Sequence, residues 1–418
     1  GCAEGPVLSA AEGPALSTAE GRHLAGHIAA IRAYAAALRG DMSRSADLTR
    51  EALERLPEED LAVRGLSAGL LGSVLRWSGD LEAAAQSLER AMAITQVAGD
   101  SRTAVEALCS LAAVQLAQGQ LHKTVSTCRD AQLLADEHVG RGGQRLPIAT
   151  SGYNLMSQVL REWNDLVGAL RRARVGIELS EQWGWPEGLA LGYRRRARAL
   201  QAIGDPEGAQ KAIEQARQAA SDLSPWFGAH MAAHQARLWL AQGNLTAASH
   251  WAQESGLRAG DEPDYQSTDD YIAFARVLIA QGRLDEASGL LARLAEMTGA
   301  AGAMSYLIET LVLQALTLQE QGKDDRALAA LERALTLAEP EGYVRTFIDE
   351  GPQMGRLLRR AVVQGITVDY AGKLLAALEK EATKAAAPPA VSRGALPPLL
   401  EPLSPRETEV LRLLTTHL

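Results

Sequence analysis

The chain has 418 residues, of which 47% are hydrophobic and 22% charged, and its net charge at pH 7 is −9. This composition excludes a wholly disordered chain, and the length suits either two or three compact domains or one long repeat array. Because it has no long uncharged hydrophobic run, no signal peptide at its start and only three cysteines without metal-ligand spacing, we expect a cytoplasmic protein that does not contact a membrane.

Eight short turns recur along residues 23–340 at nearly constant spacing. Neighbouring turn centres are 39 or 40 residues apart, apart from one interval of 45. Each centre is a glycine or, once, an asparagine, and these residues tolerate the positive φ of a left-handed turn. Each unit therefore predicts a helix, a tight turn and a second helix. The turn centres are Gly40, Gly79, Gly119, Asn164, Gly204, Gly243, Gly282 and Gly322.

Small side chains occupy two fixed positions around each turn centre. Small residues allow two helix backbones to approach closely, and stacked pairs can bury a hydrophobic stripe that one pair cannot bury alone. Seven residues before the centre stand Ala33, Gly72, Ala112, Ser157, Ala197, Ala236, Ala275 and Ala315. Five residues after it stand Ser45, Ala84, Thr124, Ala169, Ala209, Ala248, Ala287 and Ala327.

These units resemble the tetratricopeptide repeat, although they are longer than its usual 34 residues. The resemblance covers residues 23–340 and implies an all-α fold, a tetratricopeptide-like superhelix (an α-solenoid) of about eight repeats. A plain helical bundle is the alternative, but bundles need no fixed period.

The first helix of each pair should line the concave face, and its polar residues are our candidate ligand-binding site. Guanidinium groups bind carboxylate or phosphate oxygens bidentately, so we expect an effector with anionic or strongly accepting groups. The alternative is that the arginines pair with acidic residues of neighbouring repeats, such as Asp269 or Glu309. The candidate residues are Asn154, Gln158, Arg194, Arg198, Arg237 and Arg276.

The repeat pattern ends near Pro340, and the rest of the chain changes in character. Two amphipathic stretches, at about 353–364 and 368–384, predict two more helices, and a segment rich in proline and alanine follows. The expected regions are an effector domain at 1–342, a helical closing segment at 343–384, a linker at 385–402 and the start of another domain at 403–418.

The last region begins with a well-capped helix, in which Ser404 suits the N-cap and Pro405 the first helical position. The run Leu-Ser-Pro-Arg-Glu-Thr-Glu-Val-Leu from Leu403 resembles the opening of the LuxR-type helix-turn-helix domain, usually Leu-Ser/Thr-x-Arg-Glu-x-Glu-Val-Leu. After Leu414 the sequence departs from the usual Leu-Ala-x-Gly, and no recognition helix follows. The residues that carry the match are Ser404, Arg406, Glu407 and Glu409.

A second string, Gly-Tyr-Val-Arg-Thr-Phe-Ile-Asp-Glu-Gly at residues 342–351, resembles the signature that closes the repeat domain of large ATP-dependent LuxR-type activators, the MalT-like group. The resemblance implies the signal-receiving domain of a bacterial LuxR-type transcription regulator, which transmits ligand state to a C-terminal DNA-binding domain. Its implied partners are a small-molecule inducer or regulatory protein in the repeat groove, and DNA only through the completed C-terminal domain. Self-association stays open. The alternative is a free-standing tetratricopeptide scaffold that binds peptide tails.

No catalytic, cofactor or metal site is expected. The sequence has no phosphate-binding loop, no Gly-x-Ser-x-Gly elbow and no His-Glu-x-x-His helix. His23 and His27, like His230 and His234, stand four residues apart, a spacing that can hold a metal, but neither pair has a third ligand at recognisable spacing. We therefore expect no enzyme activity in this chain, with any ATPase belonging to a separate N-terminal domain.

Overall fold

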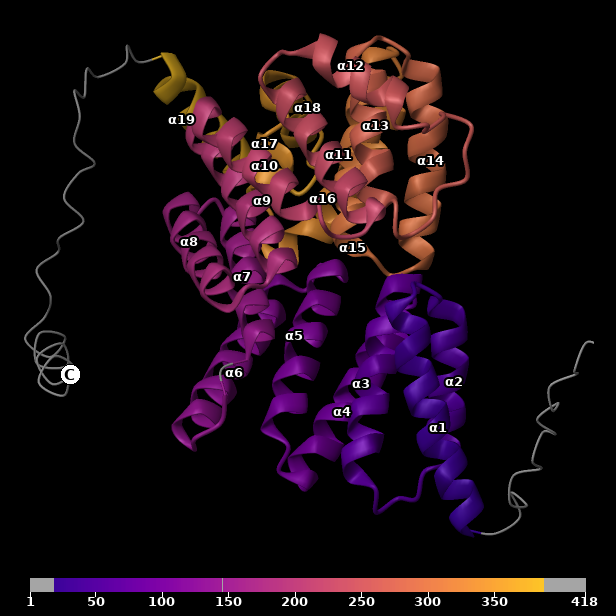
Figure 1. The fold of residues 1–418 in the computed structure, drawn as a ribbon. Coiled ribbons are helices and arrows are strands. Elements are labelled where there is room, and N and C mark those ends of the chain that lie inside the picture. The colour runs from indigo at the N-terminus through magenta and orange to yellow at the C-terminus, as the bar shows by residue number, and fades with distance from the viewer. Residues whose placement is uncertain (1–18, 145, 387–418) are drawn as a thin grey trace, which may run out of the picture. The chain divides into compact units, whose positions relative to one another are not determined.

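The structure is a computed structural model that describes residues 19–386 apart from residue 145. In this part of the chain the regular elements are helices, and sixteen of them form eight helical pairs (Figure 1). The first four pairs are α1 (Ala19–Leu38) and α2 (Met42–Arg55), α3 (Leu61–Ser78) and α4 (Leu81–Ala98), α5 (Ser101–Ala117) and α6 (Leu121–Gly140), α7 (Thr150–Glu162) and α8 (Leu166–Trp183). The last four are α9 (Pro186–Ile203) and α10 (Pro206–Ala220), α11 (Pro225–Ala241) and α12 (Leu245–Glu254), α13 (Thr268–Ala280) and α14 (Leu284–Ala300), α15 (Met304–Glu320) and α16 (Asp324–Ala338).

The predicted turn centres are confirmed. All eight have positive φ, from 63° at Asn164 to 91° at Gly204. In five units the residue after the centre caps the second helix, because its side chain accepts a hydrogen bond from a backbone N–H three residues on. These caps are Asp41, Asp80, Asp165, Asp205 and Asn244.

The sixteen small residues predicted at the helix contacts are all buried. A β-carbon added at Gly72 would come within 2.5 Å of Leu88 Cγ, so only glycine fits between those helices. In the fourth unit the two small positions are hydrogen-bonded, since Ser157 Oγ donates to the carbonyl of Ala169 at 2.8 Å. The tetratricopeptide-like superhelix is therefore built on the predicted contacts.

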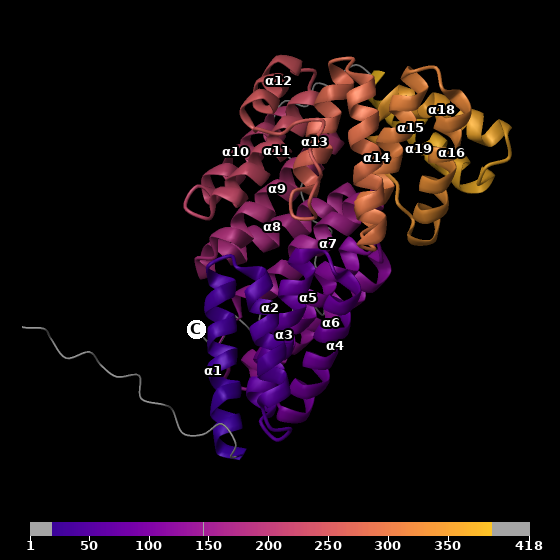
Figure 2. The ribbon, with the colours of Figure 1, turned by 90° about the vertical axis from the view of Figure 1, so that its right-hand side faces the viewer.

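The first helices of successive pairs contact each other from α7 through α9, α11 and α13 to α15. Figure 2 shows the pairs stacked side by side along the chain. The layer of first helices then returns on itself, because α15 also contacts α5. Ser305 Oγ, at the start of α15, donates to the carbonyl of Leu116 in α5 at 2.5 Å. The concave face is consequently an enclosed interior rather than an open surface.

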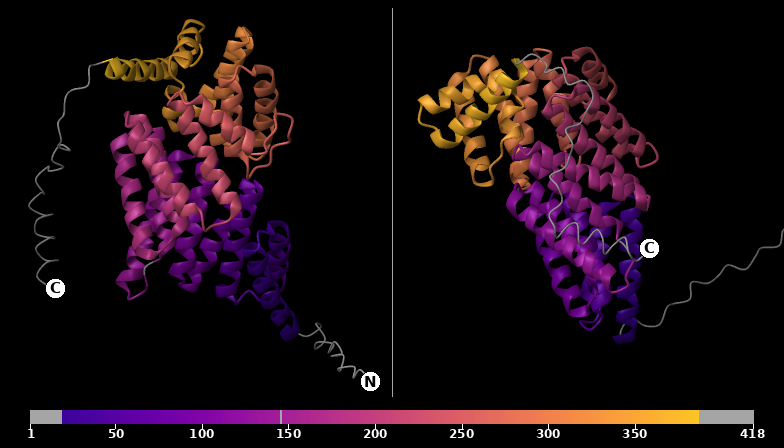
Figure 3. Two further views of the ribbon diagram at one scale, coloured as in Figure 1. Left: turned by 45° about the horizontal axis from the view of Figure 1, so that its top comes forward. Right: turned by 90° about the vertical axis from the view of Figure 1, so that its left-hand side faces the viewer.

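The closing segment follows a short 3-10 helix η2 (Glu339–Glu341) and consists of α17 (Arg345–Ile348), α18 (Gly351–Val363) and α19 (Val368–Ala386). Helices α18 and α19 confirm the two predicted amphipathic stretches, and Figure 3 gives two further views of this end. Another 3-10 helix, η1 (Pro147–Ala149), precedes α7. The segment packs back on the fourth pair: the Val344 N–H donates to the carbonyl of Glu162 at 2.8 Å.

By its internal contacts the chain divides into residues 1–378 and residues 379–418. Helix α19 continues through Ala386, two residues into the predicted linker. The rest of that linker and the predicted helix start at 403–418, with Ser404, Arg406, Glu407 and Glu409, lie outside the described residues. No helix that the structure describes is both long enough and hydrophobic enough to cross a membrane.

Candidate functional site: a central arginine cluster

Four of the six predicted site residues lie in one cluster at the centre of the superhelix. The helices α7, α9, α11, α13, α15 and α17 direct arginine and carboxylate side chains into the interior, where the returning layer of first helices encloses them. We call this set the central arginine cluster. It comprises Arg161, Arg194, Arg195, Arg198, Arg237, Arg276 and Arg345 with Glu162, Asp269, Glu309, Asp349 and Glu350.

Glu309 on α15 links two of the predicted arginines. Arg237 Nη2 donates to Glu309 Oε1 at 2.5 Å, and Arg276 Nη2 donates to the same oxygen at 2.9 Å. Arg276 also donates to both oxygens of Glu350, at 3.0 and 2.6 Å. Burial by itself would raise the pKa of Glu309, but the guanidinium groups of Arg237 and Arg276 hold it far below its usual range. The ion-pair alternative weighed from the sequence thus describes these two arginines.

A second set of pairs joins α7 to the closing segment. Arg161 donates to Asp349 and, at 2.7 Å, to Glu162. Arg345 in α17 pairs with the same Asp349. The other oxygen of Glu162 accepts hydrogen bonds from the N–H and the hydroxyl of Thr346, at 3.1 and 2.8 Å. These contacts hold the end of the repeat array against its fourth pair.

Arg194 contacts two histidines of α11 rather than a carboxylate. Its Nη1 donates to Nε2 of His234 and, at 3.1 Å, to Nε2 of His230. A guanidinium is only a donor, so both imidazoles must accept through Nε2 and be neutral there. Burial and the nearby Arg194 hold the pKa of His234 well below 6.5. The carboxylate of Asp269 lies beyond, 4.0 Å from Arg194 Nη1, and accepts a 2.9 Å hydrogen bond from the Tyr306 hydroxyl.

Arg195 and Arg198, one helical turn apart on α9, differ from the others. Neither has a hydrogen-bond or ion-pair partner among the described residues. Burial, followed by the charges of Arg161 and Arg237, lowers the pKa of Arg198 to about 9, so it remains protonated at neutral pH. Both side chains are half-buried. The cluster therefore holds two cations whose charge no neighbouring carboxylate compensates by direct contact.

The MalT-like TPR region family matches residues 26–364. The chain belongs to this family. Similar curated proteins include the HTH-type transcriptional regulator MalT of Yersinia pestis (strain Pestoides F), 25% identical over 342 residues, or 81% of this chain and 37% of that protein. The MalT of Yersinia enterocolitica serotype O:8 / biotype 1B is 25% identical over 80% of this chain and 36% of its own length. The chain thus spans little more than a third of these relatives.

Two solved structures share the fold at low sequence identity. A Rap protein complexed with competence and sporulation factor has a TM-score of 0.58 and 12% identity, covering 86% of this chain and 98% of that chain. The protein NprR in complex with its cognate peptide NprX has a TM-score of 0.53 and 13% identity, covering 85% and 99%.

Within this MalT-like repeat region, the remaining two predicted site residues lie apart from the ion pairs. Asn154 is 3% exposed, donates from Nδ2 to the carbonyl of Gly188 at 3.1 Å, and packs where a β-carbon on Gly176 or Gly192 would not fit. It therefore joins α7 to its neighbours as a packing residue. Gln158, one turn later on α7, is half-buried, and its Oε1 has no hydrogen-bond partner in the described structure.

The two acidic residues of the closing segment that pair with the arginines, Asp349 and Glu350, were not identified from the sequence. In the sequence, Asp349 and Glu350 stand out only as part of the family-like string at 342–351, whereas in the structure they pair with Arg161 and Arg276. The adjacent acidic residues in this string could have suggested partners for the arginines. The repeat period, however, does not indicate which arginines they contact. Arg195 stands three residues before Arg198, outside the position that Arg198, Arg237 and Arg276 share in their repeats, so the repeat pattern does not single it out.

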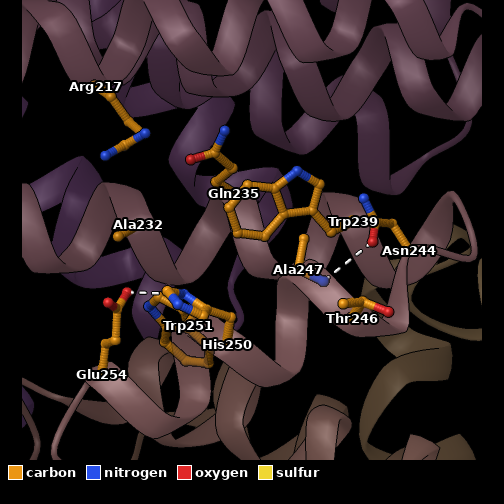
Figure 4. A pocket seen from close by; sticks show the side chains of 10 residues that line it. All are labelled: Arg217, Ala232, Gln235, Trp239, Asn244, Thr246, Ala247, His250, Trp251 and Glu254. Carbon is orange, nitrogen blue, oxygen red and sulfur yellow. Dashed lines mark hydrogen bonds and ion pairs between the residues drawn. The ribbon is translucent and has the colours of Figure 1, made fainter.

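A surface cavity of ≈ 560 Å³ lies between α10, α11 and α12 (Figure 4). Trp239 and Trp251 line it together with Arg217, His250 and Glu254, and His250 Nδ1 lies 3.0 Å from Glu254 Oε2. Its volume falls within the range of small-molecule sites, and the two half-buried indole rings suit flat or apolar ligand groups. None of the six predicted site residues lines this cavity, so it is a separate candidate.

Proposed function

We propose that this MalT-like repeat region receives an effector and transmits its binding to the C-terminal DNA-binding domain of a LuxR-type transcription regulator. The family match, relatives that are HTH-type transcriptional regulators and the LuxR-like string at 403–414 support this proposal. The Rap and NprR structures, which share the fold, are complexes with a competence and sporulation factor and with a cognate peptide. A repeat superhelix of this kind can therefore carry a regulatory ligand.

The effector's anionic groups bind Arg195 and Arg198 in this proposal. The observation that carries it is the contrast within the cluster: the other arginines have partners, whereas these two have none among the described residues. A half-buried charge without a partner is unfavourable, and a bound carboxylate or phosphate removes that cost. Gln158 on the neighbouring α7 has an unpartnered Oε1, an acceptor that suits a donor group of the same effector rather than its anion.

Effector binding is transmitted because the bound anion competes with the protein's own carboxylates for the guanidinium groups of the cluster. The cluster ties α7 and α13 to the closing segment through Asp349 and Glu350, and Glu309 of α15 links α11 to α13. An anion placed among these arginines weakens some of those ties, so it binds more tightly to a superhelix with altered closure. The closing segment is followed in the sequence by the LuxR-like string at 403–414. A change in how this segment packs on the repeats would therefore act on the DNA-binding domain.

Calorimetry with pyrophosphate and citrate as anionic probes tests the site. We expect binding by the native chain, at least tenfold weaker binding by Arg198→Gln, and no change for Arg90→Gln, whose side chain is exposed outside the cluster. Affinity that is equal in all three proteins would contradict the assignment to Arg198. Weakened binding in Trp251→Ala alone would move the effector to the tryptophan-lined cavity.

The regulatory role needs the longer protein. In the regulator that contains this chain and its completed helix-turn-helix, Arg198→Gln should reduce effector-dependent binding to promoter DNA while leaving effector-independent binding intact. A scaffold that binds peptide tails predicts no DNA-binding partner domain at all, so a reading frame without a completed helix-turn-helix would favour that alternative.

A further inference from the structure

Two histidines of α1 and one aspartate before α3 converge on a single point near the start of the superhelix. His23 and His27 lie one turn apart on α1, and Asp60 is the N-cap of α3. The Nε2 atoms of the two histidines are 2.8 Å apart. Asp60 Oδ2 lies 2.8 Å from Nε2 of His27 and 3.2 Å from Nε2 of His23.

We propose that His23, His27 and Asp60 bind a divalent zinc ion. Zinc takes imidazole nitrogen and carboxylate oxygen at about 2.0–2.2 Å, and three atoms this close together can all contact one ion. Ligand atoms around tetrahedral zinc lie roughly 3.3 Å apart, so the exposed imidazoles need to open only slightly. Three protein ligands leave a fourth position for water.

The carboxylate is held in place for this role. Asp60 Oδ1 accepts a hydrogen bond from the N–H of Val63 at 3.4 Å, which directs Oδ2 towards the histidines. Asp60 therefore presents one carboxylate oxygen to both histidines, while its other oxygen has the kind of supporting hydrogen bond that metal ligands usually have.

A similar triad of His230, His234 and Asp269, beside the central arginine cluster, does not suit a metal. His230 Nε2 lies 3.4 Å from Nε2 of His234 and 3.7 Å from Asp269 Oδ2, a comparable geometry. Arg194 Nη1, however, donates to both imidazoles and already supplies a positive charge where the ion would lie. The triad at the start of α1 contains no such cation, and its histidine side chains are 46% and 37% exposed to solvent.

Zinc at this position would fasten the first helical pair to the second. The terminal pair of a solenoid has a neighbour on only one side, and the fully buried contacts of α1 with α2 form a small cluster of Ala29, Ala52 and Leu56. A bond from α1 to the N-cap of α3 would restrain α1 at its N-terminal half. Slower amide hydrogen exchange in α1 is therefore an expected consequence of metal binding.

The test is titration of the tag-free, reduced chain with Zn²⁺ by calorimetry, and with Co²⁺ by visible absorption. We expect one tight site with the absorption bands of four- or five-coordinate cobalt. The variant His23→Gln/His27→Gln should bind Zn²⁺ at least a hundredfold more weakly. Asp60→Asn should bind at least tenfold more weakly while still capping α3, because asparagine is also a good N-cap. The exposed His250→Gln is the matched control and should bind as the native chain does.

Hydrogen exchange separates this site from metal bound elsewhere. Zn²⁺ should slow exchange in α1 of the native chain and of His250→Gln, and should not do so in His23→Gln/His27→Gln. Native-like affinity in the double variant, or in Asp60→Asn, would overturn the proposal. So would cobalt spectra of a six-coordinate, water-like ion in the native chain.

Discussion

At the scale of single residues, the central arginine cluster contains side chains of opposite energetic character. Arg237 and Arg276 share Glu309, so each guanidinium compensates a buried carboxylate. Arg198 has no such partner among the described residues and lies close to two other cations. Residues of the first kind stabilise the fold, whereas a residue of the second kind is retained at a cost to stability.

The two kinds of arginine should respond oppositely to the same replacement. Arg198→Met removes an uncompensated charge and should leave the free energy of unfolding unchanged or raise it by about 1–2 kcal/mol. Arg237→Met removes one of the two cations on Glu309 and should lower it by about 2–3 kcal/mol. Urea unfolding at pH 7 measures both. A loss of stability in Arg198→Met comparable with that in Arg237→Met would mean that Arg198 has a carboxylate partner in solution.

His234 should make the protein acid-sensitive. Burial and Arg194 hold its pKa well below 6.5, so the unfolded chain takes up a proton that the folded chain excludes. The stability due to the neutral imidazole is therefore complete above about pH 6.5 and falls below it by about 1.4 kcal/mol per pH unit.

Urea unfolding at pH 7.5 and 5.5 measures this contribution. His234→Gln keeps an acceptor for Arg194 and cannot titrate, so it should lose about 1 kcal/mol less than the native chain over this range. The exposed Arg90→Gln, which removes no group that titrates in this range, should lose as much as the native chain. An identical loss in His234→Gln would show that His234 is not held neutral.

At the scale of elements, the helix pairs depend on backbone conformation at the turn centres. Gly282 ends α13 with φ of 73°, and a β-carbon there would meet no atom within 4 Å. Any effect of a side chain at this position is therefore conformational. Gly289 lies on the exposed face of α14 with helical φ, where a β-carbon would likewise meet little.

These two glycines form a matched pair of alanine replacements with opposite expected signs. Gly282→Ala should lower the free energy of unfolding by about 1–2 kcal/mol, since a left-handed conformation strains a residue with a β-carbon. Gly289→Ala should raise it by about 0.5–1 kcal/mol, because alanine loses less backbone entropy in a helix. Thermal or urea unfolding of both variants distinguishes them, and equal shifts would contradict the left-handed turn.

At the scale of the whole superhelix, pairs of residues far apart in the sequence hold its closing segment against the repeats. Arg161 and Asp349, which pair, are separated by 188 positions, and Arg276 and Glu350 by 74. The string at 342–351, which we call the latch, holds the closing segment against the repeats. Its Phe347 is buried in the core, and its Asp349 and Glu350 form ion pairs with Arg161 and Arg276. Closure concentrates the arginines in one enclosed interior.

Weakening the latch should loosen the C-terminal helices selectively. Glu350→Gln removes the charge that Arg276 contacts through both nitrogens, so amide exchange in α17 and α18 should become faster. Exchange in α3 and α4 should stay unchanged, because those helices pack mainly against the other helices of the first three pairs. Mass-spectrometric hydrogen exchange of the native and variant chains measures both regions. Uniformly faster exchange would indicate global destabilisation instead.

The sequence by itself determined the repeating part of this protein. Turn centres such as Asn164, small residues such as Ala236 and the amphipathic stretches of α18 and α19 could all be predicted, because each is encoded within one helical pair. The arginine slot on the first helices could be predicted for the same reason. These features depend on local backbone conformation and on contacts between adjacent helices.

Only the tertiary structure decided which of these side chains meet. Each helical pair is rotated slightly relative to the next. The sum of these rotations determines whether later first helices such as α15 return to contact earlier ones such as α5. No residue pattern states that sum, so the pairing of Arg161 with Asp349 and the isolation of Arg198 could not be read from the repeats. The same holds for Asp60, whose approach to His27 depends on how α1 packs against the next pair.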